Sequence, residues 1–144
     1  MIERLSRYGI WIARVSIALI FLFNATGIID QSKPAHEMVE RGVPVAIVPF
    51  LMWCGRGLEL LAGLALAFGF QQRLAAIGLI AFLVPATLVA HPFWLASAAD
   101  RQIQIINFMK NLAMIGGLLF IASTFTTEKH QRTHDSVAGM PKHT

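Results

Sequence analysis

The chain has 144 residues, of which 56% are hydrophobic and 14% are charged, and its mean hydropathy is +0.60. This composition excludes a soluble globular domain and predicts a single polytopic membrane domain. The net charge of +4 comes from basic residues spread along the chain. That pattern excludes a nucleic-acid interface and suits tails that lie near anionic lipid.

Four apolar runs are each long enough to cross the hydrocarbon core of a bilayer. We place the predicted spans at about 8–29, 49–70, 74–90 and 108–125. Only Gln71, Gln72 and Arg73 separate the second span from the third, so these two form an antiparallel hairpin. The third span ends before Pro92, because the residue that precedes a proline disfavours helix. The predicted fold is therefore an all-α, integral membrane, four-helix up-down-up-down bundle.

The domain boundaries follow from this pattern. Residues 1–126 form the membrane domain, and residues 127–144 form a polar tail that we expect to be disordered and cytoplasmic. His130 and His134 have i,i+4 spacing, but they lie in this tail, so we favour disorder there over a metal site. The lone Cys54 excludes an intramolecular disulfide, and we expect it to be a small buried packing residue.

The distribution of Lys and Arg beside the spans predicts the orientation. One side holds Arg4, Arg7, Arg73, Lys129, Arg132 and Lys142, and the other holds Lys33, Arg41 and Arg101. This excess predicts that both termini are cytoplasmic. Residues 32–48 then lie outside, and they include a short amphipathic helix near 34–41 that ends at Gly42. Whether the chain forms a homo-oligomer is left open.

Glu59 lies near the centre of the second span, one helical turn after Arg56. A charge at mid-membrane costs about 2.5 to 3.5 kcal/mol, whereas each Leu or Phe returns only about 0.3 to 0.6 kcal/mol. Insertion of this helix alone is therefore marginal, so we expect both side chains to point into the bundle. A charge within a span is by default a candidate for a functional site.

Further polar residues lie in all four spans. Arg14 is on the cytoplasmic side of the first span, Glu59 is near mid-depth, and the others fall in the outer half of the bilayer. The candidate pocket residues are Arg14, Asn24, Arg56, Glu59, His91, Asn107, Lys110 and Asn111. We expect this set to form one cationic, polar cluster. We predict no metal site in it.

Each candidate also has a purely structural interpretation. Arg56 and Glu59 could be an ion pair that only fixes the bundle register. Arg14 could extend to the cytoplasmic headgroups or complete a triad with Glu59. Lys110 and Asn111 could anchor the interface, and His91 could cap a helix, carry protons or, least favoured, ligate a metal or haem.

Several short sequences resemble the DoxX family of small four-span bacterial membrane proteins. They are Arg14 followed by Ile20-Phe21-Leu22, Met38-x-x-x-Gly42-Val43-Pro44, Glu59-Leu60-Leu61-Ala62-Gly63-Leu64 with Gly69 and Arg73-Leu74-Ala75-Ala76, and Phe108-x-Lys110-Asn111-Leu112-Ala113 with Gly116-Gly117. The resemblance covers 4–125. Family members often carry a glycine-x-x-lysine pattern after the first span, whereas here Gly27 is followed by Ile28, Ile29 and Asp30 and the lysine is displaced to Lys33.

The resemblance implies a component of the bacterial inner (plasma) membrane near sulfur or oxidative-stress chemistry, such as a subunit of thiosulfate:quinone oxidoreductase. One hypothesis is a non-catalytic or quinone-binding component of a redox-linked assembly, in which Glu59 and His91 exchange protons with a bound quinone. The other is a scaffold or chaperone-like bundle that binds client proteins and uses its charges only for structure. The chain has no self-contained redox or hydrolytic site, so whether it is part of an enzyme is left open.

Overall fold

The computed structural model describes residues 2–29 and 32–138, and it describes side chains within 8–29 and 32–123. The elements are α1 (Ile2–Ala25), α2 (Ser32–Glu40), α3 (Val48–Phe68), α4 (Gln72–Ala90) and α5 (Arg101–Ala138). No strand occurs within these ranges, so the all-α prediction is confirmed. Four of the helices are long and apolar enough to cross a membrane, and α2 is the exception.

Two helix boundaries differ from the sequence prediction at α5. The helix begins at Arg101 and not near 108, because Gln104 and Asn107 lower the hydropathy without interrupting the helix. It then continues to Ala138, and it therefore includes 127–138 of the predicted tail. His130 and His134 lie on this helical extension, although their side chains and residues 139–144 fall outside the described part of the chain.

The predicted short helix is confirmed as α2, and glycine ends both it and α3. Gly42 and Gly69 adopt φ values of +86° and +79°, a left-handed conformation that side chains disfavour. The amides of Val43 and Phe70 then donate to the carbonyls of Met38 and Ala65, five residues back in each case. This hydrogen-bonding pattern satisfies carbonyl groups that a helix end otherwise leaves free.

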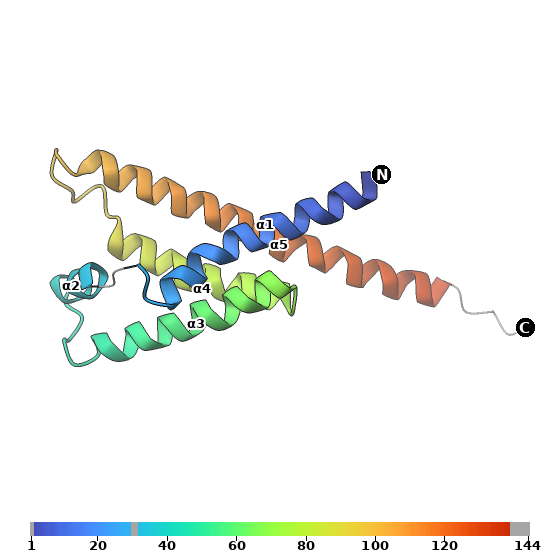
Figure 1. Ribbon diagram of the computed structural model, residues 1–144, viewed down its shortest axis with the longest axis horizontal. Coiled ribbons are helices and arrows are strands. Elements are labelled where there is room, and N and C mark those ends of the chain that lie inside the picture. The colour runs from blue at the N-terminus through green and yellow to red at the C-terminus, as the bar shows by residue number, and fades with distance from the viewer. Residues whose placement is uncertain (1, 30–31, 139–144) are drawn as a thin grey trace, which may run out of the picture.

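Each long helix packs against the next long helix of the chain: α1 against α3, α3 against α4, and α4 against α5. The start of α1, the α3–α4 turn and the end of α5 lie toward one end of the molecule, which we call the hairpin end. Helix α2 and the α4–α5 connection lie toward the opposite end, which we call the α2 end (Figure 1). The described chain therefore runs up, down, up and down.

Helices α1 and α3 pack along most of their length. A Cβ placed on Gly63 would lie 3.0 Å from Leu22 Cδ2, and one placed on Gly69 would lie 2.9 Å from Arg14 Nη1. The small residue at 63 thus brings the two backbones close together, as expected from its spacing with Ala67. The buried core continues from this interface into α4 and α5 through Ala18, Phe21, Ala62, Leu66, Ala76, Leu79, Leu83 and Leu118.

Helices α1 and α5 meet over a much smaller region (Figure 1). Their close approach is at Gly117, where an added Cβ would lie 2.8 Å from Ile17 Cδ1. The helices diverge toward the α2 end, so the outer side of α1 does not pack against α5 there (Figure 1). The structure thus gives an all-α membrane bundle in which α1 and α5 cross at one point.

The outward surface is strongly apolar. Leu61, Phe68 and Phe120 expose 71%, 84% and 67% of their areas, as expected for side chains in contact with lipid. Cys54 is also exposed on α3, so the prediction that it is a buried packing residue is wrong. Its position one turn before Leu58, which is also exposed, places it on the outward side of the helix.

Candidate functional site

Glu59 is bonded by an amide from the neighbouring helix. It is only 3% exposed, and Asn24 Nδ2 donates to both of its carboxylate oxygens, at 2.6 Å and 2.8 Å. Asn24 lies on the last turn of α1 and Glu59 at the middle of α3, so the bond joins these two helices. The sequence predicts both residues in one pocket, but the bond between them follows only from the packing of α1 against α3.

Arg56 does not form the expected ion pair with Glu59. Among the described residues no nitrogen of Arg56 lies within 4.0 Å of the Glu59 carboxylate, although the two groups attract one another at longer range. The guanidinium instead lies over the Trp53 ring, 5.8 Å from its centroid, and its Nε is buried without a hydrogen bond. Trp53 is 71% exposed, so this pair lies at the outer surface of α3.

Arg14 lies at the hairpin end, far from Glu59. Its Nη1 approaches Gly69, ten residues and therefore about 15 Å along α3 from Glu59. The proposed triad of Arg14, Arg56 and Glu59 is therefore wrong. Arg14 also precedes Asn24 by ten residues, so antiparallel packing places Arg14 at the C-terminal end of α3 and Asn24 at the middle of that helix.

Two further polar pairs connect α4 with α5. Thr87 is 4% exposed, and its hydroxyl donates to the Leu83 carbonyl at 2.6 Å while it accepts from Asn111 Nδ2 at 3.0 Å. His91 Nδ1 lies 2.9 Å from Gln104 Oε1 at the α2 end. Each pair thus satisfies polar groups of one helix with those of its neighbour.

Glu59 and His91 do not share a site. Gly55 approaches Phe82 and Gly78 approaches Leu58, so this antiparallel contact sets Glu59 level with a position near Gly78. His91 lies thirteen residues further along the chain, a distance of about 20 Å at the rise of a helix. A single quinone headgroup cannot contact both side chains, so the hypothesis of joint proton exchange is wrong in that form.

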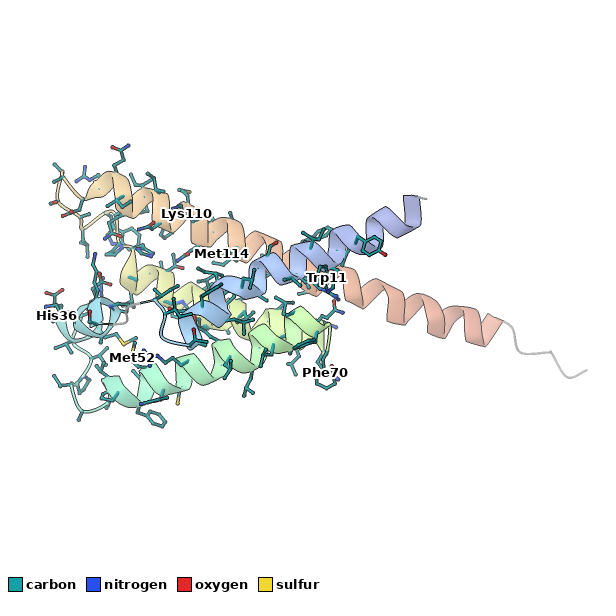
Figure 2. The ribbon with its side chains drawn as sticks, viewed as in Figure 1. Trp11, His36, Met52, Phe70, Lys110 and Met114 are labelled. Atoms are coloured by element: carbon teal, nitrogen blue, oxygen red, sulfur yellow. The ribbon has the colours of Figure 1, made fainter. Side chains whose placement is uncertain are left out.

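Asn107 and Lys110 have no hydrogen bond or ion pair within the described part of the chain. Lys110 lies on α5 (Figure 2) and is exposed, and Asn107, one turn earlier on the same helix, is half-buried. Lys110 lies near the middle of the span Arg101–Ser123. A lysine at such a depth costs about 2.5 to 3.5 kcal/mol when lipid surrounds it.

The crossing of α1 and α5 relates Lys110 to Asn24. Lys110 precedes Gly117 by seven residues, and Asn24 follows Ile17 by seven, so each lies two turns from the crossing toward the α2 end. A seven-residue step returns to the same side of a helix. Asn24 and Lys110 therefore lie on the sides of α1 and α5 that meet at the crossing.

The predicted cluster is thus divided between helix pairs. The structure joins Asn24 with Glu59, Asn111 with Thr87 and His91 with Gln104. Thr87, Gln104 and Trp53 were not among the predicted site residues. Thr87 is a hydroxyl residue in an apolar span, and it lies one helical turn before His91 on the same side of the helix. This spacing is a signal by which Thr87 could have been found from the sequence.

The family model described as DoxX matches residues 9–92. The chain belongs to the DoxX family. It is an integral membrane protein, and the DoxX match covers α1 from residue 9 onward together with α2, α3 and α4, but not α5.

Two relatives of the chain come from Escherichia coli K12. Inner membrane protein YqjF is 28% identical over 123 residues, which cover 85% of this chain and 88% of the relative. Inner membrane protein YphA is 25% identical over 114 residues, which cover 78% and 80%. No solved structure matches the chain.

Proposed function

We propose that this DoxX-family chain is a non-catalytic component of a larger, redox-linked assembly in the bacterial inner membrane. The observation that carries the proposal is the use of its buried polar groups. Glu59 and Thr87, the two buried polar residues of the described chain, are both bonded to a neighbouring helix. Polar groups that hold helices together in this way are suited to a stable membrane scaffold.

The redox link rests on the family resemblance, and the inner-membrane location rests on the names of the two relatives. Native mass spectrometry of the gently solubilised protein tests the assembly directly. We expect a complex that contains at least one additional chain. A protein that is released from native membranes only as a single chain or homo-oligomer would contradict the proposal.

Binding of a quinone is the second candidate function. The observation that favours it is that Arg56 and Lys110 lie within spans and make no hydrogen bond to the described chain, so they are available to donate to carbonyl oxygens. Extraction of the purified protein with organic solvent measures its quinone content. A stoichiometric quinone that is lost in Lys110→Met and kept in Lys33→Met would favour this function over the scaffold.

The orientation is part of the same proposal. Both termini and the α3–α4 turn would face the cytoplasm, and α2 would face outward. Reporter fusions at Gln72 and after Ala138 should then give cytoplasmic signals, whereas a fusion near Glu37 should give an external one. The reverse pattern would invert the molecule and place Lys110 in the inner half of the bilayer.

A further inference from the structure

The stripe of α5 that carries Asn107 and Lys110 is polar but has no partner in the described chain. Both residues could donate hydrogen bonds, and they make none within residues that the structure describes. Their neighbours on this side, Ile103 and Ile106, are 51% and 40% exposed. The stripe is therefore an apolar helix surface with a cation and an amide at its centre.

The depth of Lys110 restricts what can bind there. Lys110 lies nine residues after Arg101, which is about 13 Å along α5, and it is close to the midpoint of the span Arg101–Ser123. Lipid phosphates lie at the edge of a hydrocarbon core about 30 Å thick. The backbone of Lys110 is thus about half the thickness of the hydrocarbon core away from the lipid phosphates, so a phosphate headgroup does not suit it as an ion-pair partner.

A second copy of this chain cannot supply a carboxylate either. Glu59 is the only acidic residue in the four candidate spans. It is 3% exposed, and both of its oxygens accept hydrogen bonds from Asn24. The anionic partner that complements Lys110 must therefore come from another molecule.

We propose that Asn107 and Lys110 form a recognition site for a membrane-spanning helix of a different protein, which carries a carboxylate near the middle of the bilayer. The Lys110 amine and the Asn107 amide would donate to this carboxylate. The divergence of α1 and α5 toward the α2 end leaves this side of α5 uncovered by α1 (Figure 1). This inference rests on the proposed function and names the chemistry of the partner.

Designed single-span peptides provide the test. The lone, exposed Cys54 carries a donor fluorophore, and the full chain is reconstituted in phosphatidylcholine vesicles. The probes are acceptor-labelled leucine–alanine peptides with Glu, Gln or Leu at the central position. We expect the Glu peptide to reach half-maximal energy transfer at about one-tenth of the membrane density that the Leu peptide requires, with the Gln peptide between them.

Matched variants assign the effect to the stripe. Lys110→Met should remove the preference for Glu, Lys110→Arg should retain it, and Asn107→Leu should reduce it by a few fold. Lys33→Met is the control, because it removes an exposed lysine on α2, outside the four spans. Equal binding of the Glu and Leu peptides by the wild-type chain, or an unchanged preference in Lys110→Met, would overturn the inference.

Failure of this inference can be distinguished from failure of the proposed function. A chain that forms a multi-protein complex in native membranes but shows no preference for the Glu peptide would keep the assembly and overturn the carboxylate site. A chain that prefers the Glu peptide but is isolated without any partner would support the recognition chemistry and contradict the assembly. Thermal unfolding in detergent confirms that each variant is folded.

Discussion

The two neighbours of α1 contact it in different ways. Along α3 the contacts run from Arg14 against Gly69, through Leu22 against Gly63, to Asn24 against Glu59. Against α5 the close contact is that of Ile17 with Gly117, where the helices cross. The first interface combines a small residue with a buried polar bond, whereas the second depends on the tip of one flexible side chain.

The two interfaces therefore have different roles: the α1–α3 interface stabilises the fold, and the diverging side of α5 is open to other molecules. A buried carboxylate that is bonded on both oxygens holds α1 to α3, because any displacement would leave its charge without a donor. The diverging side of α5 has no such bond, and its polar groups remain available. We therefore expect substitutions at the α1–α3 interface to affect folding, and those at Asn107 and Lys110 to affect binding.

The largest expected effect is at Asn24. Asn24→Leu should lower the free energy of unfolding by about 2 to 3 kcal/mol, because it removes both hydrogen bonds from a buried carboxylate. Adding Glu59→Leu should recover part of the loss, since the unpaired acceptor is then absent. Thermal unfolding in detergent measures both changes.

Asn107→Leu provides the matched control for this prediction. It replaces an asparagine that has no hydrogen bond in the described chain, so we expect little change in stability. Equal destabilisation by Asn24→Leu and Asn107→Leu would mean that the Asn24–Glu59 bond does not hold the helices together.

Glycine substitutions should lower the free energy of unfolding by less than Asn24→Leu does. They also compare the α1–α3 and α1–α5 interfaces directly. Gly63→Ala should cost about 1 to 2 kcal/mol, because its Cβ would meet both Leu22 Cδ2 at 3.0 Å and Leu22 Cγ at 3.2 Å. Gly117→Ala should cost less, since only Ile17 Cδ1 is close and this group can rotate away. The midpoint of unfolding in a denaturing detergent titration gives the order.

Gly116→Ala is the control, because nothing lies within 4 Å of an added Cβ there. We expect no loss and a gain of up to about 1 kcal/mol from the better helix propensity of alanine. A larger loss for Gly117→Ala than for Gly63→Ala would reverse the proposed ranking of the interfaces.

The smallest effect is expected for the Thr87–Asn111 pair. Hydrogen bonds between helices in membranes average about 0.6 kcal/mol, and we expect a coupling of this size in a double-mutant cycle of Thr87→Val and Asn111→Leu. Thr87 also donates to the Leu83 carbonyl within its own helix, so the single Thr87 variant loses two bonds. A coupling near zero would show that this pair does not connect α4 with α5.

The sequence allowed most of the fold to be predicted but only part of the site. Hydropathy located the four spans, and Gly42 and Pro92 marked two helix ends, because these signals are local. Partners were harder to predict. Asn24 and Glu59 are bonded because α1 and α3 pack antiparallel in one register, and that register depends on contacts such as Gly63 with Leu22.

The predictions for Arg14 and Cys54 were wrong because the direction in which a side chain points depends on helix packing. Arg14 shares its helix with Asn24, and only the packing against α3 shows that its guanidinium lies at Gly69 and not at Glu59. The composition of a membrane helix is apolar on every side, so hydropathy does not show whether Cys54 faces lipid or the core. The helical continuation to Ala138 was missed because its polar composition resembles that of a disordered tail.

Distances between spin labels test the central comparison most directly. In a Cys54→Ala background, one label pair is placed beside the crossing at Leu19 and Ile115, and a second pair toward the α2 end at Ala25 and Met109. Both pairs lie at equivalent antiparallel positions about the contact of Ile17 with Gly117. In lipid bilayers we predict that the second distance is longer than the first by several ångströms, because α1 and α5 diverge beyond their crossing. Equal distances for the two pairs would show that α1 and α5 pack along their full length and would contradict the account.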